Sequence, residues 1–495
     1  MGMRIARMQL RAPRPFAAAP PRHAAAATVD VAARPDATQA AARRRLVNVV
    51  LVIYLLAILE GALRKYVAPQ FGQYIFFIRD PFVLYVYVLA TRFALWPPRG
   101  AFFQLSIVMG FLGVALFVAH FLFGGYSEPR LLLGIHGWRS YFLYVPLAFL
   151  VGAQFSAADL ARFSKITLLL AVPIAILVVA QFSSPINAPI NVGVAEEKEL
   201  QFVGMVLDVD HVRTTGPFTS PAGLQQFTVT ACAFLLASLL LPARRRPLGL
   251  VPTLAAGASV LTCVALSGSR GTLLQCVLTA VFAVLIGAIG RGTDLKAKAL
   301  ALPTSLAALA VVLYPIVFPA GFAVFVNRWN GAAVNEKHIE GGLIGRTWYT
   351  FIDFVHLLDG TPILGYGLGY GSNASIQMRA TVDGVRPGAF VEADFARHMV
   401  DLGPVFGLCY IVFRIALLIW LLRMVLRATR SAPDPLPMLL FAYTGYTVLI
   451  GQITGNGSIN VYGWLFVGLC IAASRVALEG AQQADSEEAH TGAHE

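Results

Sequence analysis

The sequence predicts an all-α polytopic membrane protein: a helix bundle of about 12 transmembrane helices with one large outer loop that contains an amphipathic helix. Two observations predict this class. Of the 495 residues, 57% are apolar and 13% are charged, and the mean hydropathy is +0.69, whereas soluble domains carry roughly 25% charged residues. Apolar stretches of at least about 17 residues, enough to cross the hydrocarbon layer as helices, recur along almost the whole chain.

The first 45 residues are basic and contain few large apolar side chains. The acidic residues of this segment are Asp30 and Asp36. Its arginines are Arg4, Arg7, Arg11, Arg14, Arg22, Arg34, Arg43, Arg44 and Arg45. We predict that residues 1–45 form a disordered basic cytoplasmic tail, because this composition cannot bury enough surface to fold. The segment lacks the apolar core of a secretory signal. A transit peptide has a similar acid-poor composition, but the prolines here oppose the amphipathic helix it needs. The tail does not favour a nucleic-acid partner.

Apolar runs define the predicted spans. They lie near 46–63, 74–95, 102–124, 138–154, 166–183, 221–242, 248–266, 272–289, 299–326, 398–422, 438–453 and 460–478. The second and fourth are the least regular. Residues 46–326 therefore carry spans one to nine, residues 398–478 carry the last three, and residues 479–495 form a second cytoplasmic tail.

Basic residues orient the bundle. With the N-terminus inside, the inner connectors carry Arg92, Arg99, Arg162, Lys165, Arg244, Arg245, Arg246, Arg291, Lys296, Lys298, Arg423, Arg427 and Arg430. This agrees with the positive-inside rule at every inner turn. Both termini are then cytoplasmic, and the short connector Ser267-Gly268-Ser269-Arg270-Gly271 faces outward.

Two outer segments are long, 184–220 and 327–397. Within the second, residues 345–358 place Trp348, Phe351, Ile352 and Val355 at helical spacing on one face, which predicts an amphipathic helix. It can lie in the membrane interface, pack against the bundle, or do both. Residues 359–371 follow as a glycine-rich turn that fails the dinucleotide-binding pattern. Tight turns and close backbone packing explain the glycines best, with backbone amides lining a ligand site as the alternative.

Three arginines occupy outer turns that border predicted spans: Arg213, Arg270 and Arg346. Arg346 opens the amphipathic helix, where a cation opposes the helix dipole. A docked anion would explain it, because guanidinium groups and helix N-terminal amides bind anions together. Each arginine alone can instead reach toward lipid headgroups. Three of them in outer turns favour a diphosphate or sugar-phosphate site.

Acidic residues near the same loops are further candidates. Asp208 and Asp210 form a D-x-D pair that can hold a divalent cation, although a solvated acidic turn explains so short a motif better. Glu392 ends the large loop, directly before the tenth span. Partial burial would raise the pKa of this carboxylate toward the range of a general base. Its alternative role is to stabilise the helix dipole.

Secondary candidates follow in the same region and in the second span. Asp394, His398 and Asp401 come shortly after Glu392, and we interpret His398 as structural. Asp80 adjoins Arg79 in the second predicted span, and such an ionisable pair lines a cavity or neutralises itself. Arg414, in the tenth span, is either a partner within the bundle or a residue that reaches the cytoplasmic surface.

Four segments resemble the O-antigen ligase and O-antigen polymerase superfamily of bacterial membrane glycosyltransferases. They are Arg213-Thr214-Thr215-Gly216-Pro217-Phe218 with Pro221, Ser267-Gly268-Ser269-Arg270-Gly271, Gly345-Arg346 with the helix after it and Pro362-Ile363-Leu364-Gly365-Tyr366-Gly367, and Glu392 through Asp401-Leu402-Gly403. Each is degenerate alone. Their order, their outward placement and the single large loop before the last three spans carry the resemblance, which covers about residues 46–478.

The resemblance implies a site on the periplasmic face of the bacterial inner membrane. The donor would be a polyprenyl-diphosphate-linked oligosaccharide, held by Arg213, Arg270 and Arg346. The acceptor would be a glycan or a lipid, and the transfer would need neither a metal nor a cofactor. Further expected partners are membrane lipids and proteins of polysaccharide chain-length control or export. Bidentate arginine contacts suit a diphosphate that gains negative charge as it leaves.

One departure decides between two members of this superfamily. Ligases that attach glycan to lipid A core carry a His-Asn pair near the end of the large loop, and this chain has Glu392 in the position of that histidine. A glutamate can still accept a proton from a sugar hydroxyl. The sequence therefore favours an exopolysaccharide or O-antigen polymerase, with an O-antigen ligase as the alternative. A lipid-linked-glycan flippase or transporter, or a scaffold of a polysaccharide assembly complex, is the alternative of another class.

Overall fold

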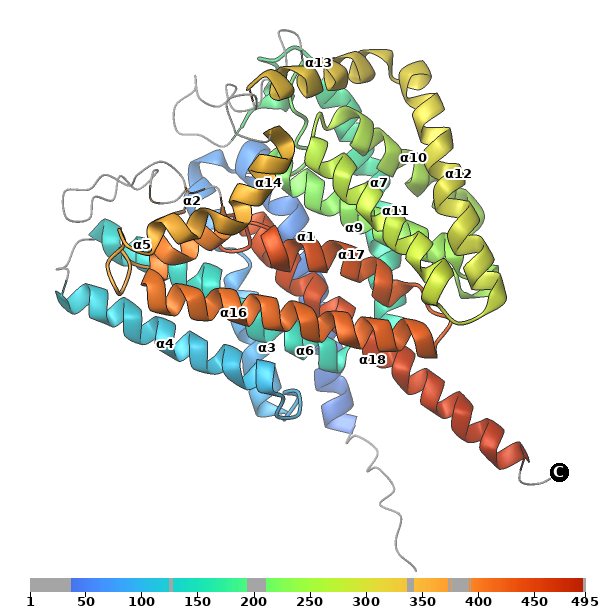
Figure 1. The fold of residues 1–495 in the computed structure, drawn as a ribbon, viewed down its shortest axis with the longest axis horizontal. Coiled ribbons are helices and arrows are strands. Elements are labelled where there is room, and N and C mark those ends of the chain that lie inside the picture. The colour runs from blue at the N-terminus through green and yellow to red at the C-terminus, as the bar shows by residue number, and fades with distance from the viewer. Residues whose placement is uncertain are drawn as a thin grey trace, which may run out of the picture.

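The computed structural model describes residues 37–123, 128–193, 211–335, 342–372, 375, 391 and 393–492, and its regular elements are helices (Figure 1). As predicted, the chain is an all-α membrane-type bundle. Within the described ranges, eight helices are long and apolar enough to cross a membrane. They are α1 (Ala37–Ala62, continued to Val67 by the π-helical turn η1), α4 (Ala101–Phe123), α7 (Ala157–Ser183), α9 (Pro221–Leu240), α11 (Arg270–Ile289), α12 (Thr293–Val317), α16 (Asp394–Ser431) and α18 (Gly457–Gly492).

The remaining predicted spans are shorter or broken. α10 (Leu250–Leu266) and α17 (Leu436–Ile450) are short apolar helices. The predicted span 74–95 consists of α2 (Gly72–Ile75) and α3 (Asp80–Arg92), with a turn between them. The predicted span 138–154 consists of the π-helical turn η3 (Arg139–Leu143) and α6 (Val145–Gln154), preceded by α5 (Glu128–Trp138). Both breaks lie beside buried arginines, and a proline opens the helix that follows, where its missing N–H is tolerated.

The predicted span 299–326 is wrong beyond Val317. α12 ends at Val317, and α13 (Pro319–Asn335) begins a separate helix that crosses one end of the bundle (Figure 1). Phe318 has φ −128° and ψ 62°, and Pro319 cannot donate a helical hydrogen bond, so the helix breaks between them. Tyr314 caps the break, because its hydroxyl donates to the carbonyls of Ala265 (2.8 Å) and Gly321 (3.1 Å). We call this end, which carries Ser267–Arg270 beside α13, the hairpin end.

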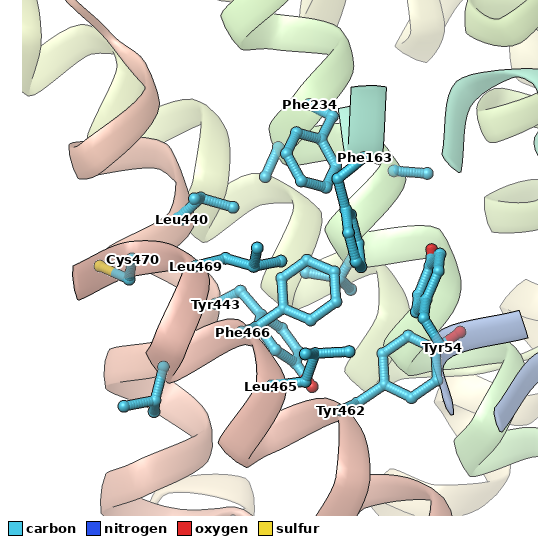
Figure 2. Packing of buried hydrophobic residues seen from close by; sticks show 14 of the residues in the cluster. Tyr54, Phe163, Phe234, Leu440, Tyr443, Tyr462, Leu465, Phe466, Leu469 and Cys470 are labelled. Atoms are coloured by element: carbon cyan, nitrogen blue, oxygen red, sulfur yellow. The ribbon is translucent and has the colours of Figure 1, made fainter. Parts of the chain in front are cut away.

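Aromatic side chains form the centre of the bundle (Figure 2). Tyr462 and Phe466 of α18 stack at 5.8 Å, and Phe466 meets Tyr443 of α17 edge-on at 5.3 Å. The apolar windows of α9 and α18 are each 83% buried, whereas those of α4 and α12 are 17% and 6% buried. The exposed valines and leucines of α4 and α12 suit contact with acyl chains. α9 and α18 are therefore central helices, and α4 and α12 are peripheral.

The helix predicted within residues 345–358 is present as α14 (Gly342–Ile352) and the 3-10 turn η7 (Asp353–Leu357). Phe351 and Phe354 pack edge-on against Phe395 of α16, at 6.4 and 6.3 Å between ring centres. Trp348 points away and is 61% exposed. The face toward α16 explains the aromatic spacing, so packing against the bundle accounts for part of the pattern, and exposed Trp348 remains available to an interface.

The glycine-rich turn packs against a kink in α16. Gly403 has φ +76°, and a Cβ there would overlap the carbonyl oxygen of Ile363. Pro404 cannot donate to the carbonyl of Val400, and the N–H of Tyr366 donates to that oxygen instead at 2.8 Å. Gly365, Gly367 and Gly369 also have positive φ. The predicted tight turns and close backbone packing are confirmed.

The predicted tail boundaries differ from the helices. α1 begins at Ala37, so residues 37–45 are helical where a disordered tail was predicted. α18 continues to Gly492, through most of the segment 479–495 that was predicted as a tail. In the first case Arg43 is anchored: its guanidinium donates to Asp159 and, at 2.8 Å, to the carbonyl of Gln154. These contacts explain why the helix extends beyond its apolar run.

Candidate functional site

Arg270 opens α11 in a two-helix hairpin, where the sequence predicted it. α10 ends at Leu266 and α11 begins at Arg270, with Ser269 as the N-cap that accepts from the N–H of Thr272. Gly268 supplies positive φ in the turn. The guanidinium carbon of Arg270 lies 5.7 Å from the ring centre of Trp329 in α13, within cation–π range. The hairpin therefore presents this arginine beneath α13.

The segment that carries Arg213 lies directly against this hairpin. The hydroxyl of Thr214, which is fully buried, donates to the carbonyl of Leu266 at 3.0 Å. The next residues are held by Gln181 of α7, whose side-chain oxygen accepts from the N–H groups of Thr215 (3.1 Å) and Gly216 (2.8 Å). Two of the three predicted anion-binding arginines thus sit on adjoining backbone segments, although 57 positions separate them in the sequence.

The structure describes only part of the other predicted site residues. Arg346 lies on α14, but its side chain falls outside the described residues. Glu392 and the pair Asp208 and Asp210 also fall outside them. Among the residues that the structure describes, no group of three or more His, Cys, Asp or Glu side chains could hold a metal ion.

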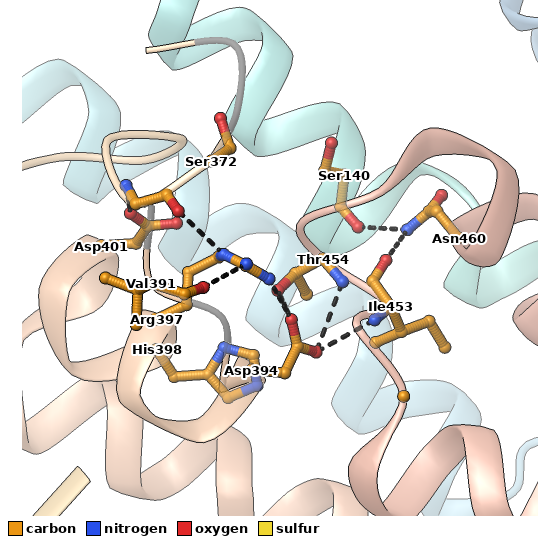
Figure 3. A network of polar contacts seen from close by, with 12 residues as sticks. Ser140, Ser372, Val391, Asp394, Arg397, His398, Asp401, Ile453, Thr454 and Asn460 are labelled. Atoms are coloured by element: carbon orange, nitrogen blue, oxygen red, sulfur yellow. Dashed lines mark hydrogen bonds and ion pairs between the residues drawn. The ribbon is translucent and has the colours of Figure 1, made fainter. Parts of the chain in front are cut away.

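Asp394 is the centre of a buried polar network at the start of α16 (Figure 3). Its Oδ1 accepts from Arg397 (2.5 Å) and from the hydroxyl of Thr454 (2.9 Å). Its Oδ2 accepts from Arg414 (2.6 Å) and from the N–H of Ile453 (3.1 Å). The carboxylate joins α16 to the loop before α18. With its lone-pair positions occupied, Asp394 acts as a structural anchor rather than as a proton acceptor.

His398 has one defined tautomer. Arg414 Nη1 lies 2.9 Å from His398 Nε2, and a guanidinium can only donate, so Nε2 accepts. The proton is then on Nδ1, which lies 3.0 Å from the hydroxyl of Tyr141. That hydroxyl donates to Asp401 at 3.1 Å, and Asp401 also accepts from the N–H of Gly371 at 2.6 Å. The prediction that His398 is structural agrees with this chain of bonds.

Arg397 joins the two described sides of the large loop. Its Nε donates to the carbonyl of Gly371 at 3.0 Å, and its Nη2 donates to the carbonyl of Val391 at 2.5 Å. Val391 directly precedes Glu392, and Asp394 follows two residues later. Sequence reasoning missed Arg397, although its i,i+3 spacing from Asp394 was a signal for a pair on one helical face.

Asp80 and Arg79 do not neutralise each other, which corrects one of the two predicted outcomes for this pair. Asp80 accepts from Arg139 Nε at 2.5 Å and from the hydroxyl of Tyr144 at 2.8 Å. Arg79 pairs instead with Glu60 of α1 at 2.8 Å. Neither Glu60 nor Arg139 was selected from the sequence, because each lies in an apolar run with no neighbouring motif.

Arg414 is a partner within the bundle and not a residue of the cytoplasmic surface. Besides Asp394 and His398, its guanidinium donates to the carbonyls of Val448 (2.8 Å) and Gly451 (3.1 Å) in and after α17. It therefore ties α16, α17 and the loop before α18 together.

No family model and no curated protein matches this chain. The resemblance to the O-antigen ligase and polymerase superfamily rests on the four sequence segments, and it stays a prediction.

Proposed function

We propose that this protein is a membrane glycosyltransferase that joins polyprenyl-diphosphate-linked oligosaccharide units on the outer face of the membrane, as an exopolysaccharide or O-antigen polymerase. In this proposal, α3, α6, α10 and α17 complete about 12 crossings of the bacterial inner membrane, both termini are cytoplasmic, and the hairpin end faces the periplasm. One observation carries the proposal: the Thr214 to Leu266 hydrogen bond, which joins the Arg213 segment to the Arg270 hairpin.

The proposed reaction is an inverting displacement at the anomeric carbon of the donor. Glu392 takes the proton of the acceptor hydroxyl, and the oxygen of that hydroxyl forms the new bond to the anomeric carbon. The bond from this carbon to the diphosphate oxygen breaks, and the polyprenyl diphosphate leaves with the electron pair. Arg213, Arg270 and Arg346 stabilise the charge that develops on the leaving group, which is where guanidinium contacts contribute most.

The arrangement around Glu392 supports its role indirectly. The carbonyl of Val391 is bonded to Arg397, and the carboxylate of Asp394 is bonded to Arg397 and Arg414. The residues on both sides of Glu392 are therefore fixed to buried guanidinium groups. A positioned backbone suits a general base, which must lie within hydrogen-bond reach of the attacking hydroxyl.

The test is Arg270→Ala in cells whose only copy of the protein is the variant. Loss of a charge-assisted contact to the leaving group is expected to slow transfer by about 100-fold or more, so long polymer should disappear from gels while the protein remains in the membrane fraction. Arg244→Ala is the matched control, because Arg244 is exposed in the turn between α9 and α10 at the other end of the bundle. It should leave polymer length unchanged.

Three outcomes distinguish the proposed polymerase from the alternative functions. Normal polymer in Arg270→Ala contradicts the assignment of this arginine. Free polymer that accumulates without attachment to its lipid acceptor identifies a ligase. Purified protein in detergent that consumes the lipid-linked oligosaccharide excludes a flippase or transporter, since detergent provides no second compartment.

A further inference from the structure

A second group of buried and half-buried cations lies at the hairpin end, next to the segment that follows Arg213. It contains Arg64, Lys65, Arg79 and Arg139, together with the carboxylates Glu60 and Asp80. Lys65 connects it to the Arg213 segment, because its Nζ donates to the hydroxyl of Thr215 at 2.8 Å and to the carbonyl of Gly216 at 3.2 Å. We call these four cations the arginine cluster.

The two carboxylates accept hydrogen bonds from only some of the nitrogen donors of the arginine cluster. Glu60 accepts from Arg79 Nη2 at 2.8 Å and from Arg64 Nη1 at 3.4 Å. Asp80 accepts from Arg139 Nε at 2.5 Å. Both Arg79 and Arg139 are buried, at 1% and 4% exposure. Yet Arg79 Nε and Nη1, Arg139 Nη1 and Arg64 Nε have no hydrogen-bond partner within the described parts of the chain.

Other buried arginines of the same bundle differ in this respect. Arg414 donates from all three nitrogens, to Val448, Asp394, His398 and Gly451. Arg397 likewise donates from all three nitrogens. Leaving a buried charged donor without a partner is energetically costly, and buried polar groups in folded proteins are normally hydrogen-bonded. Incomplete pairing therefore distinguishes Arg64, Arg79 and Arg139 from Arg397 and Arg414, and it points to a missing acceptor.

The charge of the missing acceptor follows from the count of groups. Among the described residues, three guanidinium groups and the Lys65 amine outnumber the two carboxylates, which leaves positive charge without a carboxylate partner. His136, which packs 5.3 Å from the ring of Phe76, does not add to the excess, because burial and the nearby Arg139 lower its pKa to about 3. Buried charges are normally paired. A negatively charged acceptor would balance the group.

Phe76 and Gly457 border the guanidinium groups of the arginine cluster. Phe76 is shared by two cations, with the guanidinium carbons of Arg139 and Arg64 at 4.5 and 5.5 Å from its ring centre. On the α18 side, Gly457 packs closely against Phe76 and lies beside Arg79: a Cβ built there would lie 2.9 Å from Phe76 Cε2 and 3.7 Å from Arg79 Nη2. Gly457 also opens α18, whose N-terminus favours negative charge.

We propose that the arginine cluster binds a phosphate-class dianion, held by the unpartnered nitrogens of Arg79, Arg139 and Arg64 beside the start of α18. The group would be a phosphomonoester or a diphosphate, carried either by a lipid headgroup or by a water-soluble ligand. Exposed Phe71 and Tyr74, in the segment between Lys65 and Arg79, provide an apolar border on which a lipid or sugar can rest. The site does not depend on the proposed glycosyl transfer.

The test measures equilibrium binding of radiolabelled inorganic pyrophosphate to the purified full chain in detergent. Arg79→Lys and Arg139→Lys keep the positive charge but remove the fork of donors, and each should weaken binding at this site by about 10- to 100-fold. Glu60→Gln removes a competing negative charge and should strengthen it. Arg475→Lys is the control, because all three nitrogens of Arg475 are already bonded, at the other end of the bundle.

Competition identifies the source of the dianion. Displacement of pyrophosphate by dihexanoyl phosphatidic acid but not by inorganic phosphate supports a lipid headgroup, and the reverse supports a soluble ligand. Arg270→Ala distinguishes this site from the proposed donor site. Any pyrophosphate binding that Arg270→Ala removes should be the part that persists in Arg79→Lys. Binding to the arginine cluster itself should be unchanged in Arg270→Ala. Wild-type affinity in both Arg79→Lys and Arg139→Lys, with no gain in Glu60→Gln, overturns the proposal.

Discussion

Asp394→Asn tests whether the network at the start of α16 holds the fold together. The substitution keeps the shape of the side chain but removes the negative charge that Arg397 and Arg414 share at 2.5 and 2.6 Å. One amide NH₂ would also replace an oxygen that accepts from a guanidinium, so donor would face donor. Removal of one partner from a buried ion pair costs about 3 to 5 kcal/mol, because the other charge stays buried without compensation.

The assay is thermal unfolding of the purified protein in detergent. For a chain of this size, each kcal/mol of lost stability lowers Tm by about 2 °C or less, so the expected fall in Tm is up to about 10 °C. Glu479→Gln is the matched control. Glu479 also pairs with an arginine, Arg475 at 2.9 Å, but its side chain is 52% exposed, and exposed pairs contribute about 0 to 1 kcal/mol. Equal Tm values for the two variants would refute the structural role of Asp394.

Two further predictions concern the elements that meet α16. Gly403→Ala should destabilise the protein by at least about 1 to 3 kcal/mol, because φ +76° is unfavourable for alanine and its Cβ would overlap the carbonyl of Ile363. Gly360→Ala is the control and should leave Tm unchanged, because a Cβ there would have open space. A similar Tm for the two variants would contradict the packing argument. Tyr141→Phe breaks the bonds to both His398 and Asp401 and should cost about 1 to 3 kcal/mol, measured by urea unfolding; an unchanged midpoint would mean that the hydroxyl does not hold the network.

The sequence predicts the helices of this protein better than their interruptions. Long apolar runs locate α4, α9 and α11 closely, because hydropathy alone determines such elements. The breaks before α3 and within 138–154 escape the same reasoning. A hydropathy window averages the hydropathy of many residues, so it hides a single arginine such as Arg79 or Arg139. The distant partner of that arginine requires the turn. Asp80 and Arg139 are 59 positions apart, and no local pattern relates them.

The candidate site is predictable to a similar degree. Topology predicts that Arg213 and Arg270 emerge at the same end of the bundle, but it does not predict which turns are neighbours at that end. Their adjacency includes a side-chain to backbone bond, from Thr214 to Leu266, across two segments with no shared motif. The arginine cluster was missed for another reason: two of its members, Arg64 and Lys65, follow an apolar run and resemble ordinary residues that border a membrane.

The hydrogen-bond partners of the carboxylates also bear on the choice of general base. A base must offer an oxygen to the attacking hydroxyl. At the hairpin end, Asp394 is bonded to two arginines, Glu60 to two arginines, and Asp80 to Arg139 and Tyr144. Asp401 accepts from Gly371 and Tyr141. Ion pairing to arginine makes a carboxylate a weaker proton acceptor. Three of these four carboxylates are paired in this way, and each oxygen of the fourth, Asp401, accepts a hydrogen bond. The three carboxylates paired with arginine are therefore better suited to holding the fold than to proton transfer, and Glu392 stays the base of the proposed reaction.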